Sequence, residues 1–491
     1  MIYIINTILT TSFIFICSHY LFQQIRFQQF KGPLSLPLIG ILYDPKSSFI
    51  IQYLNSCIKK YGSIFTFSIG MKQMLVVSEP QLVRKILTDT ETFIKGPDYT
   101  KKFAVVFGEG LVTSNGEKHK IDKRCLGRFF TKNHIEKYNK MICEETDKMI
   151  KEELKPNVGT TIDIQNFFHL LSLRIFGKFS MEKDYSLPEN KEIAKKINNG
   201  VKIGSNIIGS HIIMNIPMFS FFPSIKIVNK IVKYVDEHVN KIINDTFQKM
   251  NQNEITKDNI LTTLIIRHLR DHLGEPLDNR MKQIHDHIRT TLAAGHDTTA
   301  FFGCYMAYLL ANHPEVQDKI RNEMNIYITN YNYITETEIS KLSYCRCVLQ
   351  EVLRLYTIIP FVNRTNTKPY RIEETKQVIP ANTTILIPLT LMNRSDKIWE
   401  NPTLFNPERF MDIMGHNSAK HGYFPFGYGS RTCIGSNLAI TEGMIMMIKL
   451  INEFDLYPDP TFKPEIIAGI SLISKNGINV RLEKRVYESD L

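Results

Sequence analysis

The sequence predicts a mainly α-helical protein with a minor β-sheet part, an α+β fold built as one large unit. Over most of the 491 residues, the apolar side chains recur at helical spacing. Strand-forming patterns are confined to short patches at 64–70, 74–77 and 383–389, of which the first two are expected to form a hairpin. Pro80 is expected to open a helix that runs to about Leu87. The longest periodic stretch, 279–311, is long for a helix of a globular protein. A hydrophobic content of 43% is enough to build a large core.

The chain begins with an apolar segment, residues 2–22, that has no charged side chain before Arg26. At about 1.5 Å per residue, a helix of this length is about 30 Å long, which is enough to cross a bilayer. Arg26 and Lys31 follow the segment, and positive charge there favours a cytosolic position for the rest of the chain. We therefore expect a signal-anchor transmembrane helix at 1–22.

Three other interpretations of this segment exist. A cleaved signal peptide needs a charged start and a small-residue cleavage site, and a mitochondrial presequence needs many arginines; neither pattern is visible. A buried core helix seldom starts at residue 2. Residues 23–44, which contain Pro33 and Pro37, are predicted to be a stiff linker, and 45–491 to be the main domain.

Charge and cysteine content narrow the function further. The net charge of +11 indicates either a lysine-rich solvated surface or a basic face for an acidic protein or anionic lipid. No nucleic-acid-binding signature is present, so we expect no nucleic acid partner. The eight cysteines are scattered along the chain, which does not fit a disulfide framework and favours a reducing compartment.

One of these cysteines, Cys433, lies in the glycine-rich segment 426–435. Glycine permits tight bends and close approach of the backbone to a flat ligand. A lone cysteine cannot hold zinc, which needs four ligands, but it can bind a haem iron, because the porphyrin supplies the in-plane ligands. Arg431 is then available for an anionic group such as a haem propionate. An inert buried cysteine in a turn is the alternative.

Segment 426–435 matches every fixed position of the signature Phe-x-x-Gly-x-Arg-x-Cys-x-Gly, and thus resembles the cytochrome P450 family. The resemblance, which extends over roughly residues 33 to 485, implies a long central helix over haem b and a thiolate loop before the last long helix. It implies that Cys433 is the axial iron ligand. It also implies that Phe426, Arg431 and Gly435 surround the cofactor in a haem-binding monooxygenase domain.

Within the long helix, residues 293–299 are similar to the oxygen-binding motif of the family. Gly295 removes a side chain from one face, and Thr298 can donate to the carbonyl of Ala294, which together can open a groove. The resemblance implies that Thr298 delivers protons to bound dioxygen and that Asp297 feeds this relay. A helix with tolerated small and polar residues is the alternative. One to two turns earlier, His285, Asp286, His287 and Arg289 are expected to form a solvated or interhelical polar face rather than a metal site.

Glu351 and Arg354 are three residues apart and can pair on one helix face. They resemble the Glu-x-x-Arg motif of the family, and 405–410 matches its Pro-Glu-Arg-Phe segment. The resemblance implies that Arg409 completes a buried structural network, whereas an exposed ion pair is the alternative. It also implies that Arg364 contacts a propionate.

The chain departs from the family in the helix that resembles Trp-x-x-x-Arg, whose two fixed residues touch a haem propionate. Here His119 and Lys123 occupy those two places, and Arg124 could substitute for the arginine. Histidine and lysine still donate hydrogen bonds, but the bidentate geometry of arginine is lost. The basic side chains around them resemble the face on which family members dock an acidic reductase.

The resulting hypothesis is a single-pass protein of the endoplasmic reticulum membrane with a cytosolic catalytic domain. It would activate dioxygen with electrons from NADPH, delivered by a flavoprotein reductase, and oxidise a lipophilic small molecule. Two alternatives remain: a reductase-independent haem-thiolate isomerase or dehydratase, and a non-enzymatic haem-binding protein. The expected substrate-recognition stretches are largely apolar; they are 103–112, 200–222, 358–362 and 469–472.

Overall fold

The computed structural model describes residues 2–44, 46, 49–213, 223–252, 254, 258–270, 276–411 and 422–485. The α-helices are α1 (Ile2–Arg26), α2 (Ile50–Tyr61), α3 (Pro80–Thr88), α4 (Pro97–Phe107), α5 (Gly116–Gly127), α6 (Lys132–Glu136), α7 (Asn139–Met149), α8 (Gln165–Met181), α9 (Pro188–Ile213), α10 (Pro223–Asn251), α11 (Ile260–Arg270), α12 (Leu277–Ala311), α13 (Pro314–Tyr327), α14 (Glu336–Lys341), α15 (Ser343–Leu355), α16 (Leu389–Met392) and α17 (Ser436–Glu453).

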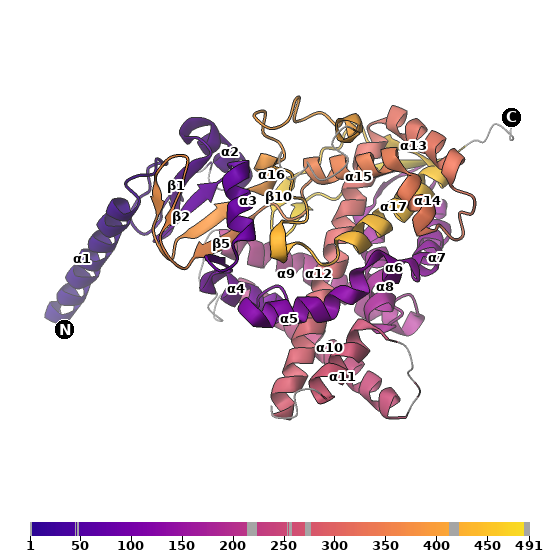
Figure 1. The fold of residues 1–491 in the computed structure, drawn as a ribbon, viewed down its shortest axis with the longest axis horizontal. Coiled ribbons are helices and arrows are strands. Elements are labelled where there is room, and N and C mark those ends of the chain that lie inside the picture. The colour runs from indigo at the N-terminus through magenta and orange to yellow at the C-terminus, as the bar shows by residue number, and fades with distance from the viewer. Residues whose placement is uncertain are drawn as a thin grey trace.

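The strands are short by comparison. They are β1 (Ile64–Ile69), β2 (Lys72–Val77), β3 (Phe93–Ile94), β4 (Thr161–Asp163), β5 (Val362–Asn366), β6 (Tyr370–Arg371), β7 (Val378–Ile379), β8 (Thr384–Ile387), β9 (Phe454–Pro458), β10 (Ile466–Ala468), β11 (Leu472–Ser474) and β12 (Asn479–Lys484). The prediction of a mainly helical fold with a minor β part is confirmed (Figure 1).

The largest sheet has the strand order β1-β2-β8-β5-β3. Strands β1 and β2 form the predicted hairpin, whereas β2 pairs with β8 in parallel. The remaining sheets among the described residues are β4-β12-β9, β10-β11 and β6-β7. Helix α3 begins at Pro80, as predicted, because the first helical position does not need an N–H donor.

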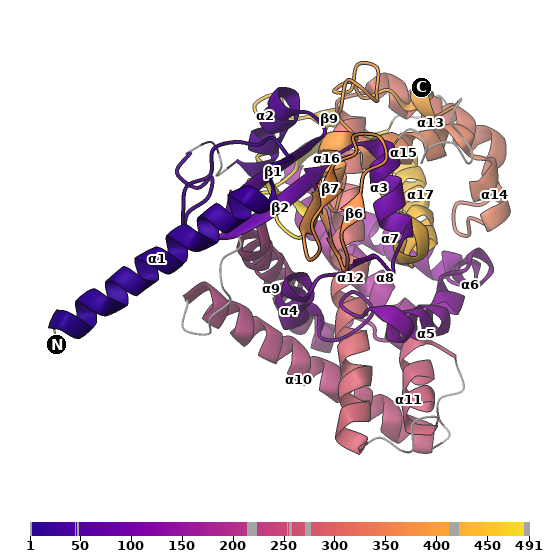
Figure 2. The ribbon, with the colours of Figure 1, turned by 60° about the vertical axis from the view of Figure 1, so that its left-hand side comes forward.

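Helix α12 passes through the centre of the helical part of the molecule (Figures 1 and 2). It ends at Ala311, and Pro314 starts α13, in agreement with the predicted stop. Most of its side chains from Ile284 onward are buried. Helix α8 packs against it closely at two glycines: a Cβ atom would lie 2.3 Å from the Phe176 ring at Gly295 and 2.6 Å from the Phe168 ring at Gly303.

Gly295 is expected from the sequence to open a groove, and in the structure it also has a second role, in helix packing. Gly295 does line the internal cavity. However, the volume of its missing side chain is filled by Phe176 of α8. The glycine primarily permits the close packing of two helices.

Helix α1 projects away from the rest of the molecule at the sheet side (Figures 1 and 2). Its apolar side chains are exposed; Tyr3 is 88% and Phe13 68% exposed. The segment that follows α1 contacts the largest sheet. Phe27, Phe30 and Ile41 are buried, and the backbone N–H groups of Thr66 and Ile41 donate to Lys31 and Ser68. This segment therefore packs along β1.

Candidate functional site

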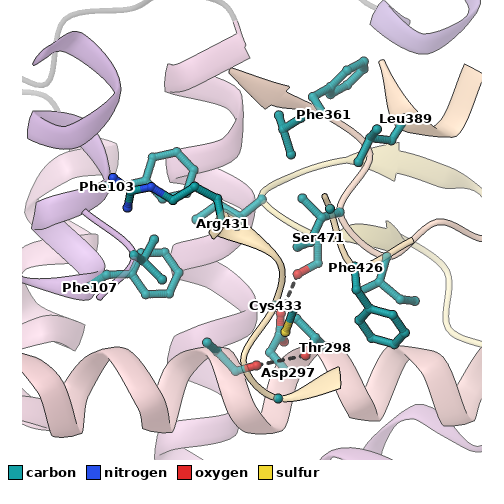
Figure 3. A pocket seen from close by; sticks show the side chains of 18 of the residues that line it. Phe103, Phe107, Asp297, Thr298, Phe361, Leu389, Phe426, Arg431, Cys433 and Ser471 are labelled. Atoms are coloured by element: carbon teal, nitrogen blue, oxygen red, sulfur yellow. Dashed lines mark hydrogen bonds between the residues drawn. The ribbon is translucent and has the colours of Figure 1, made fainter. Parts of the chain in front are cut away.

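A cavity of about 390 Å³ lies between α12 and the loop that precedes α17. Helices α4 and α5 and strand β5 contribute to its walls. Figure 3 shows Phe103, Phe107, Phe361 and Leu389 around it, with Cys433 and Thr298 near its floor. The cavity therefore combines a largely apolar wall with a few polar groups.

The loop before α17 presents Cys433 to this cavity. Gly427 and Gly429 adopt φ values of +75° and +72°, which side chains other than glycine rarely tolerate. The N–H of Cys433 donates to the carbonyl of Phe426 at 2.8 Å, which closes the turn. Phe426 and Gly435 line the cavity with Cys433.

The Cys433 side chain is exposed, and because it lines the cavity, that exposed surface faces the cavity. Burial raises the pKa of its thiol, an effect that the N–H of Gly435 and the charge of Lys123 partly offset. A free thiol in this position therefore stays protonated at neutral pH. A metal cation bound to the sulfur would hold it as the thiolate.

Basic side chains gather at one end of the cavity: Lys95, His119, Lys123, Arg364 and Arg431. Burial, together with the charges of Arg364 and Arg431, lowers the pKa of Lys95 far below its usual value. Burial and Arg364 lower the pKa of Arg431 to about 10. Like charges thus crowd one another in a partly desolvated place.

These four cations (Lys95, Lys123, Arg364 and Arg431) form no ion pair with a carboxylate in the described part of the chain. Their hydrogen bonds go to neutral acceptors. Arg431 donates to the carbonyl of Ser114 at 2.7 Å and to Oδ1 of Asn115 at 2.9 Å. Arg364 donates to the carbonyl of Asn363 at 2.8 Å, and Lys95 donates to the carbonyl of Val112. An anionic group in the cavity would relieve their repulsion.

Lys95 is a member of this group that the sequence reasoning missed. It follows β3 and precedes the turn at Gly96, so no helical or strand periodicity identifies it. Its neighbours in the sequence are a mixture of polar and apolar residues, and two further lysines, Lys101 and Lys102, follow closely, so nothing local distinguishes it. Its place beside Arg364 and Arg431 arises from tertiary packing.

Helix α5 carries His119 and Lys123, the two positions that depart from the family pattern. The Lys123 ammonium donates to the carbonyls of Ser430 and Thr432, at 2.7 Å each. This side chain thus holds the backbone immediately before Cys433. His119 is buried, and burial and Arg431 lower its pKa to about 3, so it is neutral. Arg124 is exposed and does not line the cavity.

Helix α12 brings Asp297 and Thr298 to the cavity wall. The Thr298 hydroxyl donates to the carbonyl of Ala294 at 2.9 Å, the bond that the spacing allows. Oδ2 of Asp297 accepts a hydrogen bond of 2.9 Å from Ser471, in the turn between β10 and β11 (Figure 3). Asp297 is only 3% exposed, whereas Thr298 is half-buried.

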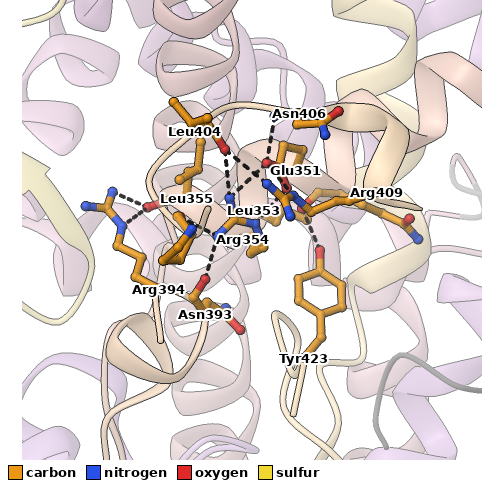
Figure 4. Close-up of polar contacts among 12 residues, drawn as sticks. Glu351, Leu353, Arg354, Leu355, Asn393, Arg394, Leu404, Asn406, Arg409 and Tyr423 are labelled. Atoms are coloured by element: carbon orange, nitrogen blue, oxygen red, sulfur yellow. Dashed lines mark hydrogen bonds and ion pairs between the residues drawn. The ribbon is translucent and has the colours of Figure 1, made fainter. Parts of the chain in front are cut away.

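The structural network lies outside the cavity, at the end of α15 (Figure 4). Arg354 donates to both oxygens of Glu351, at 2.7 and 2.8 Å. Nε of Arg409 donates to Oε1 of Glu351 at 3.0 Å. Glu351 and Arg354 are 0% exposed, whereas Arg409 is half-buried. Arg354 also donates to the carbonyls of Asn393, Pro402 and Leu404.

The group around His285 forms an inter-element polar contact. Arg289 donates to Asp236 of α10 at 2.9 Å, and Asp286 accepts the N–H of Glu109 at 3.0 Å. Burial opposes a charge on His285, but hydrogen bonds with Asp236 and Asp286 raise its pKa to about 9. Within the described residues, no group of three or more His, Cys, Asp or Glu side chains could hold a metal.

The expected recognition stretches contribute unequally to the cavity. The stretches 103–112, 358–362 and 469–472 each supply several lining residues. Of the stretch 200–222, Gly200 and Gly204 line a separate apolar pocket of about 30 Å³ between α9 and α10. Residues 214–222 lie outside the described residues.

These residues fit a haem. The cavity offers one thiol as an axial ligand, cations with no carboxylate partner for two propionates, and apolar walls for a porphyrin. Fold and site together define a haem-thiolate protein.

Comparisons with known proteins agree with this assignment to the haem-thiolate proteins. The pattern described as "Cytochrome P450" matches residues 30–479. The putative cytochrome P450 CYP13A7 of Caenorhabditis elegans is 26% identical, with 93% of this chain and 94% of the relative covered. Cytochrome P450 4A14 of Rattus norvegicus is 27% identical (90% and 88% covered), and cytochrome P450 4X1 of Homo sapiens 25% (88% and 86%). The chain belongs to the cytochrome P450 family, and it is a haem-thiolate oxidoreductase of the monooxygenase class.

Proposed function

We propose that this protein is a membrane-anchored monooxygenase that oxidises a lipophilic organic substrate with electrons from NADPH, delivered by a separate flavoprotein reductase. The observation that carries the proposal is the Cys433 thiol in a largely apolar cavity that is also lined by cations with no carboxylate partner in the described part of the chain. When bound, the haem supplies an iron centre at which dioxygen is activated.

Different residues of the chain are proposed to bind different parts of the haem. Cys433 would bind the haem iron through its sulfur, and Phe426 and Gly435 would line the porphyrin site. Arg364 and Arg431 would neutralise the propionates, and Lys95 would add a third cation near them. His119 can donate a neutral hydrogen bond from the same wall.

Lys123 acts mainly on the loop of Cys433. Its two bonds to the carbonyls of Ser430 and Thr432 fix the loop backbone, and its charge favours the thiolate. This role compensates for the lost bidentate contact that arginine would make to a propionate.

Thr298 and Asp297 hold and pass protons at the cavity wall. Thr298 presents a hydroxyl near the floor that carries Cys433, and Asp297 is connected to the same wall through Ser471. A carboxyl group beside a hydroxyl can relay protons in a place from which bulk water is excluded. Glu351, Arg354 and Arg409 have no part in this chemistry and instead stabilise the fold.

The apolar wall supports a lipophilic substrate. The rings of Tyr99 and Phe103 stack with centroids 4.0 Å apart, and Phe107 continues the stack at 5.7 Å from Phe103. Such a wall binds a ligand mainly by removing its apolar surface from water, and therefore discriminates little among lipophilic ligands.

Helix α1 supports membrane attachment. The stretch Ile5–Arg26 is long and apolar enough to span a bilayer, with a mean hydropathy of 1.4 and no burial inside the protein. We assign 1–22 to a single-pass anchor in the endoplasmic reticulum, 23–44 to the connecting segment, and 45–491 to a cytosolic haem domain. Carbonate extraction of membranes tests this: the full chain stays in the pellet, and a chain lacking residues 2–26 is released.

The central experiment is the spectrum of the reduced, carbon-monoxide-treated protein. Thiolate ligation gives the strongly red-shifted Soret band, and Cys433→Ser abolishes it while Cys347→Ser does not. Substrate oxidation should then require both NADPH and the reductase. Peroxide rearrangement without either would support the isomerase or dehydratase instead.

A further inference from the structure

A cluster of buried ionisable groups lies where α8 meets α12, beside the cavity wall. His169 of α8 is 1% exposed, and His296 and Asp297 of α12 are 0% and 3% exposed. A buried carboxylate is costly unless hydrogen bonds or an opposite charge compensate for its lost hydration. The groups around Asp297 therefore decide whether it carries its charge.

The close packing of the two helices brings His169 to this place. The rings of Phe168 and Phe176 sit over Gly303 and Gly295, so α8 runs antiparallel along α12. His169 directly follows Phe168 and lies edge-on to the Phe301 ring, with centroids 4.8 Å apart. Phe301 is four residues after Asp297, on the same helix face.

The two carboxylate oxygens of Asp297 face different partners. Oδ2 accepts from the Ser471 hydroxyl at 2.9 Å, and Ser471 lines the cavity. Oδ1 lies 3.8 Å from Nδ1 of His169, within range of an ion pair if the imidazole is protonated. Asp297 thus bridges the cavity wall and the protein interior.

Two titratable groups on the same helix, His296 and Tyr305, do not supply a compensating charge. Nδ1 of His296 donates to the carbonyl of Leu292 at 3.1 Å, and burial lowers the pKa of this imidazole to about 4. Tyr305 donates its hydroxyl to the carbonyl of Leu472 at 2.8 Å, and burial raises its pKa well above the usual value. Both are neutral, whereas His169 is a basic side chain within ion-pair distance of Asp297.

We propose that His169 is a positioning residue that keeps Asp297 ionised and oriented between Ser471 and the interior. The imidazolium places an opposite charge 3.8 Å from Oδ1 of the carboxylate. The consequence for turnover rests on the proposed function, in which Asp297 feeds protons to the cavity. The charge pair itself can be tested without turnover.

Infrared difference spectroscopy of the haem-loaded full chain at neutral pH tests the pair. His169→Phe removes the compensating charge, so Asp297 takes up a proton and a carbonyl band of a protonated carboxyl group appears. The band is lost again when Asp297→Asn is added to this variant. His169→Gln, which is less disruptive to packing, gives the same band. Glu442 is buried with a raised pKa, so its band is present throughout and cancels in the difference.

His238→Phe is the matched control, because His238 is a buried histidine that contacts Tyr185 far from Asp297 in the chain. It should give no new band that depends on Asp297. A His169→Phe spectrum that equals the wild type in the protonated-carboxyl region overturns the proposal, as does a band that survives Asp297→Asn.

Turnover adds a second readout. With the reductase and a bound substrate, His169→Phe should raise the peroxide formed per NADPH several-fold, and Asp297→Asn should add little in the His169→Phe background, since the two act as one unit. Additive effects of the two changes contradict the proposal. If the wild type itself shows no NADPH-dependent oxidation, the proposed function fails, and the infrared result still decides the role of His169.

Discussion

Glu351→Ala is the perturbation with the largest expected effect on stability. Glu351 accepts two bonds from Arg354, one from Arg409 and one from the N–H of Asn406 at 2.9 Å. Its removal leaves the Arg354 guanidinium, which is 0% exposed, as an uncompensated buried charge. Breaking a buried pair in this way costs about 3–5 kcal/mol. That is a large share of the about 5–15 kcal/mol by which native domains are stable.

The Glu351→Ala change should destabilise mainly the segment around 402–404, which leads toward the cysteine loop. Arg354 also donates to the carbonyls of Pro402 and Leu404, so its displacement releases the backbone between these two residues. Haem content, measured as the ratio of Soret to protein absorbance, should be close to zero for this variant. Its urea midpoint should fall far below that of the wild type.

The pair of Glu117 and Lys120 provides a matched control. It has the same three-residue spacing and an N···O distance of 2.6 Å, but both side chains are exposed. Glu117→Ala should therefore leave haem content and urea midpoint unchanged, because solvent replaces the lost contact. Wild-type haem content and an unshifted midpoint in Glu351→Ala would refute the buried-network argument.

Three further outcomes are expected. Thr298→Ala should raise the peroxide released per NADPH consumed, and an unchanged ratio would remove Thr298 from the relay. Lys123→Met frees the loop carbonyls of Ser430 and Thr432, so its carbon monoxide complex should lose the red-shifted Soret band faster on storage than the wild type; equal decay rates would contradict the clamp. His285 has a folded-state pKa raised to about 9, so the stability that it contributes is fully present below its ordinary value of about 6.5 and is lost as pH rises through about 9. The urea midpoint of His285→Phe should accordingly depend less on pH between pH 6 and 10 than the wild-type midpoint does. The same pH dependence in both proteins would exclude this contribution.

Local patterns predicted the helices and strands well, because apolar periodicity and proline positions act within a few residues. The helix from Pro80 and the long central helix, for example, end within a few residues of their expected limits. The cysteine loop was visible because its chemistry lies in ten consecutive residues.

Contacts between distant segments were not predictable in this way. The sequence gives no sign that Phe176 fills the space beside Gly295 or that His169 faces Asp297, since both depend on how α8 packs on α12. Lys95 joins the cavity cations only through the fold. The bonds from Lys123 to the cysteine loop likewise depend on the placement of α5 against a segment about three hundred residues later.

The cluster of cations in the cavity also affects the stability of the protein before haem is bound. The like charges of Lys95, Arg364 and Arg431 repel one another there. A doubly anionic ligand would offset this repulsion, because each cation is attracted to it. Because a ligand that binds only the folded chain stabilises it by mass action, newly made protein should be the most vulnerable to proteolysis. Its cellular abundance should therefore rise and fall with the supply of haem.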